Sequence, residues 1–188
     1  MIRIERDTRE TSVRCGLALV PGDVRVATGI GFLDHLLGTL ATHAGWSLDL
    51  ACNGDLAVDD HHTAEDSALA LGEALDRELG DRLGIARFGD AFAPLDESLA
   101  RAVVDLARRP YAHVRLGLRR DAIGGLAAEN VAHVLRSFAI SARFTLHVDV
   151  LRGRNDHHRA EAAMKAAARA LRAALRPGDS NSTKGTLL

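Results

Sequence analysis

Several residue types are scarce in this 188-residue chain, and each shortage excludes a class of protein. Aromatic residues make up only 4% of it, so the core must rest on Leu, Ala, Val and Ile. The two cysteines, Cys15 and Cys52, are too few and too far apart for a disulfide framework or a cysteine zinc site. We interpret them as reduced, which indicates a cytoplasmic protein.

Charge and long apolar runs are also lacking. The formal net charge is -1, which argues against a nucleic-acid-binding surface. No run of about 18 apolar residues is present, and residues 1–6 contain no apolar signal segment, so a membrane partner is not expected. The remaining classes are soluble enzymes and binding proteins of ordinary composition.

Histidine is the informative residue type. The chain has nine histidines, and four of them form two copies of a His-His-x-x-Glu motif. Chance predicts only about 0.02 copies of this motif in such a chain. The motifs begin at His61 and His157, and they end at Glu65 and Glu161. On a helix, positions i and i+4 share a face, so each motif presents an imidazole and a carboxylate together.

The motifs lie at matching places in an internal repeat. We expect strands at 2–8, 12–20 and 24–27, a helix at 33–43, a strand at 46–52, and a helix from Asp59 or Asp60 to residue 79. The same order follows with strands at 86–92, 100–106 and 111–116, a helix at 128–142, a strand at 144–150, and a helix from Asn155 or Asp156 to about 176. This predicts one α+β domain made of two halves, 1–85 and 86–176, with a C-terminal loop at 177–188.

One further histidine precedes each motif by a similar interval. His35 lies 26 residues before His61, and His133 lies 24 residues before His157. With these two, the candidate ligands number eight: His35, His61, His62, Glu65, His133, His157, His158 and Glu161. That is too many for one tetrahedral zinc ion but suits two ions with open positions, of Mn, Fe, Co or Zn.

Two questions stay open at this level. Adjacent histidines diverge in direction, so a pair can serve two ions or two subunits. The motif residues can also be solvated polar groups at helix N-termini. His43, His113 and His147 stand alone in apolar surroundings, and we interpret them as packing or surface residues.

A second, weaker signal points to phosphate. Arg87, Arg109 and the terminal Ser182, Thr183 and Lys184 offer a guanidinium fork, hydroxyls and an ammonium group. The tail from Gly178 could close over an anion.

These residues resemble a known family. The segments GIGFLDH (29–35), DDHHTAED (59–66), RFGD (87–90), APLDE (93–97), RPY (109–111) and STKG (182–185) are similar to blocks of imidazoleglycerol-phosphate dehydratase, and the similarity runs from residue 9 to the C-terminus. The resemblance implies two four-stranded sheets packed together with helices outside. It also implies two Mn²⁺ per chain on the eight ligands above, and a 24-subunit homo-oligomer with active sites between subunits.

The resemblance also implies a reaction. A hydro-lyase of this family converts imidazole glycerol phosphate to imidazole acetol phosphate and water in histidine biosynthesis, through a metal-bound imidazolate and a diazafulvene-like intermediate. The implied substrate contacts are Glu10, Arg87, Arg109, Lys165, Ser182, Thr183 and Lys184. Glu161 and Glu10 are the candidates for proton transfer, with Glu65, Lys165 and Asp96 as further ones.

Three departures keep other functions in view. Ala132 stands where the family commonly has Glu, Thr39 where it often has Gln, and the segment 119–128 is unlike the family. The ligands survive all three changes. The alternatives are another two-metal phosphoester enzyme and a non-catalytic, metal-bound cage-forming paralogue.

Overall fold

The computed structural model describes residues 1–179, and these form two four-stranded sheets with the same internal order. In each sheet, three adjacent strands pair antiparallel, and the strand at one edge pairs parallel with its neighbour. The first sheet has the order β1 (Ile2–Asp7), β2 (Thr11–Ala18), β4 (Ser47–Gly54), β3 (Val24–Ala27). The second has the order β5 (Phe88–Leu95), β6 (Ser98–Asp105), β10 (Thr145–Arg152), β7 (Tyr111–Arg115). The identical topology confirms the duplicated α+β fold.

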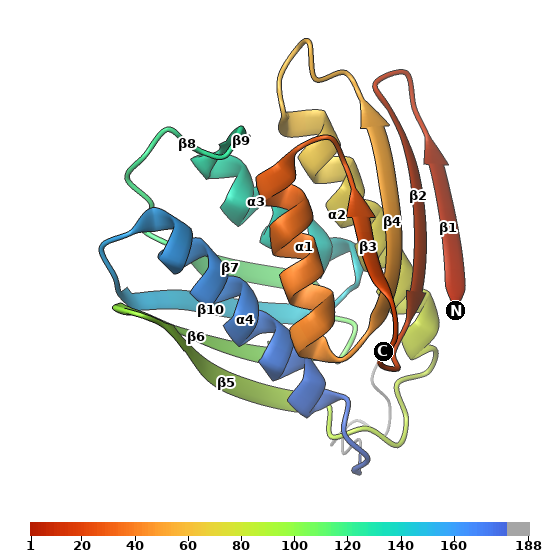
Figure 1. The fold of residues 1–188 in the computed structure, drawn as a ribbon. Coiled ribbons are helices and arrows are strands. Elements are labelled where there is room, and N and C mark those ends of the chain that lie inside the picture. The colour runs from red at the N-terminus through yellow and green to blue at the C-terminus, as the bar shows by residue number, and fades with distance from the viewer. Residues whose placement is uncertain (180–188) are drawn as a thin grey trace.

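Four helices lie between the sheets (Figure 1). They are α1 (Gly31–Ala44), α2 (His61–Leu79), α3 (Ala128–Ser141) and α4 (Asp156–Ala174). Helix α1 packs on α4 and α2 packs on α3, while α4 also covers β5 and β6, and α2 covers β2. The duplicated two-sheet fold is therefore as expected, but the layer order is not, because the helices are inside and the sheets outside.

The layer order has a physical reason in the side chains. Outward positions of the first sheet are polar, as at Arg3 and Glu5, so each sheet has one apolar face to bury. Helix α4 buries alanines around much of its circumference, which lets it pack against a helix and a sheet at once. Gly72 allows the close approach of α2 to α3, since a Cβ there would meet the Phe138 carbonyl oxygen at 2.7 Å.

The segment 119–128 has no counterpart in the first half. It carries a short hairpin of β8 (Ala122–Ile123) and β9 (Leu126–Ala127) that leads into α3. Among residues 1–179, no helix is both long enough and apolar enough to span a membrane.

Candidate metal centres

Each His-His-x-x-Glu motif begins a helix. Asp59 Oδ1 accepts a hydrogen bond from the backbone N–H of His61 at 2.8 Å, and Asn155 Oδ1 accepts one from that of His157 at 2.9 Å. These side chains satisfy backbone donors that a helix start leaves without partners. Because α2 begins at His61 and α4 at Asp156, the first histidine and the glutamate of each motif lie one turn apart on one face.

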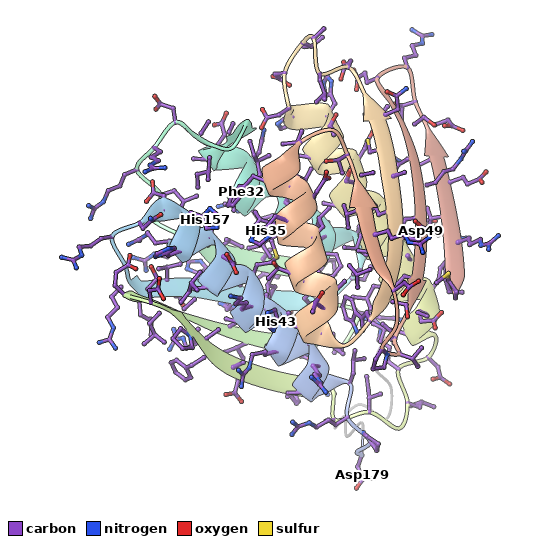
Figure 2. The ribbon with its side chains drawn as sticks, viewed as in Figure 1. Phe32, His35, His43, Asp49, His157 and Asp179 are labelled. Atoms are coloured by element: carbon purple, nitrogen blue, oxygen red, sulfur yellow. The ribbon has the colours of Figure 1, made fainter. Side chains whose placement is uncertain are left out.

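The first donor group combines α1 with α4, and we call it the α1–α4 cluster: His35, His157 and Glu161. Glu161 Oε2 lies 3.0 Å from His35 Nε2 and 3.2 Å from His157 Nε2. One donor atom from each of the three residues lies within 4.8 Å of the other two. Figure 2 shows His35 and His157 on neighbouring helices, with Phe32 beside them.

The second donor group combines α3 with α2, and we call it the α2–α3 cluster: His61, Glu65 and His133. His133 Nε2 lies 3.0 Å from Glu65 Oε1, and the rings of His61 and His133 stack with centroids 4.8 Å apart. Its donor atoms also lie within 4.8 Å of one another. Each cluster therefore joins the motif of one half to the lone histidine of the other half.

The second histidine of each motif turns away from both clusters. His62 Nδ1 lies 3.0 Å from Asp55 Oδ2, and its Nε2 lies 3.6 Å from Glu10. His158 Nδ1 lies 2.8 Å from Glu97 Oε2, and its Nε2 lies 3.7 Å from Asp96. Of the eight expected ligands, the described chain thus brings six together in two groups and leaves His62 and His158 apart.

Neighbouring carboxylates favour the protonated form of His62 and of His158. A hydrogen bond with Asp55 raises the pKa of His62, and one with Glu97 raises the pKa of His158, against the opposing effect of desolvation. The Glu97 carboxyl has a pKa well below its usual range, mainly because the backbone N–H of Asn155 and the imidazole of His158 hydrogen-bond to it.

Within residues 1–179, Glu161 differs from Glu65 in having a lysine next to it. The Lys165 ammonium lies 2.6 Å from Glu161 Oε1, whereas Leu69 occupies the matching position one turn after Glu65. Burial alone would raise the pKa of Glu161, but hydrogen bonds with Lys165 and His35 outweigh it and lower the pKa to about 2. Glu161 is therefore ionised at neutral pH and held from two sides.

Arg87 and Arg109 share one carboxylate, and Arg87 lies at the opposite end of α4 from the α1–α4 cluster. Both bond to Asp105, with Arg87 Nε at 2.8 Å and Arg109 Nη2 at 3.1 Å, and the bond to Asp105 raises the pKa of Arg87. The Arg87 N–H bonds to the Ala174 carbonyl. Ala174 follows Glu161 by thirteen positions in α4, which is roughly 20 Å at ~1.5 Å per residue. Ser182, Thr183 and Lys184 lie outside the described residues.

Comparison with known proteins places this geometry in a family. The family model of imidazoleglycerol-phosphate dehydratase matches residues 28–171. The enzyme of that name from Eremothecium gossypii is 53% identical, with 98% of this chain and 96% of that protein covered. The one from Candida glabrata is 51% identical over the full length of both. The chain belongs to the imidazoleglycerol-phosphate dehydratase family.

Solved structures of the family share the fold. Imidazoleglycerol-phosphate dehydratase from Staphylococcus aureus is 34% identical, covers 94% of this chain and 98% of its own, and superposes with a TM-score of 0.83. The enzyme from Pyrococcus furiosus in complex with (S)-C348 is 34% identical, covers 97% and 99%, and gives a TM-score of 0.85.

The segment 119–128, which we expected to be unlike the family, has a structural role here. Asp156 Oδ2 accepts hydrogen bonds from the backbone N–H groups of Arg119 and Arg120, both at 2.7 Å. Asp60 Oδ2 accepts one from Ala127 N–H at 2.6 Å. The segment therefore ties together the starts of α2 and α4, the two helices that carry the motifs.

Sequence reasoning missed three residues around the clusters. Asp55 and Glu97 hold His62 and His158, and Asn130 contacts His61. Of these three, only Glu97 could have been noticed from the internal repeat, because it directly precedes β6 as Glu10 directly precedes β2.

Proposed function

We propose that this chain catalyses the family reaction, the removal of water from imidazole glycerol phosphate to give imidazole acetol phosphate in histidine biosynthesis. The observation that carries the proposal is the pair of His–His–Glu clusters, each assembled from both halves of the chain. Duplicate centres of this kind suit a substrate whose imidazole ring has two nitrogens to hold.

The donor chemistry fits Mn²⁺ at both clusters. Two neutral imidazoles and one carboxylate leave open positions on a metal that prefers six ligands. His35, His157 and Glu161 would hold one ion, and His61, Glu65 and His133 the other. When bound, such ions lower the pKa of a coordinated group and stabilise developing negative charge.

Two Mn²⁺ per chain are expected after loading the purified protein. Elemental analysis following removal of loosely bound metal measures the ratio directly. Glu65→Gln and Glu161→Gln should each lower it toward one, because each removes the only carboxylate of one cluster. A ratio of zero or one in the parent chain would contradict the two-metal proposal.

The remaining groups would act on the substrate. Glu161 is the candidate to take a proton, because its carboxylate lies within the α1–α4 cluster. Glu10 stands next to His62, so the two would enter a site together. Arg87, Arg109 and the terminal Ser182, Thr183 and Lys184 would hold the phosphate through charge-assisted hydrogen bonds.

Three features support a homo-oligomer, for which the family resemblance implies 24 chains. His62 and His158 face away from their own clusters and could complete those of neighbours. Arg87 bonds to the backbone at Ala174, roughly 20 Å along α4 from Glu161, and Arg109 shares Asp105 with Arg87, so one small substrate would not reach these arginines and Glu161 within a chain. The outer face of the second sheet also exposes apolar rings, with Phe92 and Tyr111 each 53% exposed.

Arg109→Ala and Lys184→Ala are each expected to raise KM by about tenfold or more, because each removes a charge-assisted contact to phosphate. Arg101→Ala is the matched control, since Arg101 lies on the same sheet but pairs with Asp149. Steady-state kinetics at saturating Mn²⁺ measures the effect. An unchanged KM in both variants would place the phosphate elsewhere.

One assay separates the proposed function from its rivals. Product formation from imidazole glycerol phosphate with Mn²⁺ present supports the dehydratase. Turnover of simple phosphoesters alone would indicate a different two-metal enzyme, and an inert, metal-loaded particle would indicate a cage-forming paralogue. A cytoplasmic setting is supported by Cys15 and Cys52, which are both buried and free.

A further inference from the structure

Among residues 1–179, the α2–α3 cluster has a buried amide that its counterpart lacks. Asn130 is only 2% exposed, and its Oδ1 lies 3.2 Å from His61 Nδ1. Asn130 lies three residues before His133, so the two side chains share one face of α3. That face therefore presents the candidate ligand His133 together with the amide that contacts His61. Nothing in the duplicated pattern requires an amide here.

The matching position in the α1–α4 cluster holds an aromatic ring. Phe32 lies three residues before His35, and its ring packs against His157 with centroids 5.0 Å apart. A phenyl ring positions the imidazole by packing and leaves its protonation unspecified. The two clusters therefore orient the first histidine of their motifs by different means.

The amide contact determines which nitrogen of His61 can bind an ion. A neutral imidazole carries one N–H donor and one lone pair, and an amide oxygen only accepts. His61 Nδ1–H donating to Asn130 Oδ1 therefore leaves the lone pair on Nε2. Metal-bound histidines commonly have their other nitrogen fixed in this way, which sets the tautomer and the ring orientation.

We propose that Asn130 is a positioning residue for the α2–α3 centre, holding His61 in the tautomer and orientation that present Nε2 to a divalent ion. The inference rests on the proposed function, since it takes the cluster to be a metal site. Asn130 would thus contribute to the Mn²⁺ affinity of the α2–α3 centre without binding the ion itself. The α1–α4 centre does not depend on it.

Mn²⁺ titration of the metal-free full chain tests this proposal, with free Mn²⁺ followed by its electron paramagnetic resonance signal. Asn130→Leu keeps the side-chain size and removes the acceptor. It is expected to weaken one of two sites by about 10- to 100-fold and to leave the other unchanged. Asn130→Asp retains an acceptor oxygen and should stay within a few-fold of the parent chain.

A double-variant comparison separates positioning from general structure. If Asn130 acts through His61, Asn130→Leu has no further effect on affinity in a His61→Ala background. Phe32→Leu, at the matching position of the other half, should leave the α2–α3 site at its parent affinity. If the leucine variant does not fold by circular dichroism, Asn130→Ala removes the same acceptor without filling the space, and the same loss is expected.

The outcomes distinguish this inference from the proposal beneath it. Two sites of parent affinity in the variant lacking the acceptor would overturn the role of Asn130 alone. The role of Asn130 would also be overturned if Asn130→Leu lowered the Mn²⁺ affinity by the same factor in the His61→Ala background. A parent chain that binds fewer than two ions would overturn the two-metal proposal together with this inference.

Discussion

Glu161→Gln is expected to lower kcat by about 10²- to 10⁴-fold, the range typical of removing a positioned acid or base. The carboxylate contacts His35, His157 and Lys165 at once. Glutamine keeps the size but removes the charge, so it can neither accept a substrate proton as a base nor balance Lys165. Steady-state kinetics at saturating Mn²⁺, with metal content measured on the same sample, gives the effect.

Two matched variants show whether Glu161 does more than bind metal. Glu65→Gln removes the corresponding carboxylate of the α2–α3 cluster, which has no lysine partner among residues 1–179, so its residual kcat per bound ion should be higher. Glu73→Gln changes an exposed glutamate on α2 that pairs with Arg77, and should have no effect. If Glu161→Gln lost activity only in proportion to its metal content, Glu161 would be a ligand and not also a base.

The donor groups could be predicted from the sequence only in part. Helical periodicity places His61 with Glu65 and His157 with Glu161, because that geometry is local. The lone histidine of each cluster comes from the other half of the chain, which no local pattern reveals. Which lone histidine joins which motif depends on the packing of α1 against α4 and of α3 against α2. The repeat itself would suggest that His35 belongs with His61, and the fold exchanges them.

The layer order shows the same limit. Alternation along the strands predicts one buried face per sheet, but not which element covers it. The alanine-rich sequence of α4 did indicate that this helix lies between two layers, since small residues around a helix permit packing on two sides. Asp55 and Asn130 could not be found, because their contacts with His62 and His61 depend on side chains meeting across separate elements.

Removing metal is expected to break a large particle into smaller oligomers. Each cluster offers three protein ligands, while His62 and His158 point elsewhere from positions next to ligands. If these two histidines bind ions held by neighbouring chains, metal affinity forms part of the association free energy. Light scattering during a chelator titration should show the particle mass falling as metal leaves, and recovering when Mn²⁺ is added back.

The histidine variants identify the contact responsible. His62→Ala with His158→Ala removes both outward-facing imidazoles but keeps the two three-donor clusters, so this double variant should remain in the smaller form even with Mn²⁺ present. Glu73→Ala with Arg77→Ala is the matched control, because this exposed ion pair lies on α2, outside both clusters and on a different element from Phe92 and Tyr111. The control should assemble like the parent chain. A particle of constant mass after its metal is shown to be gone would mean that the ions lie inside subunits and that other contacts hold the assembly together.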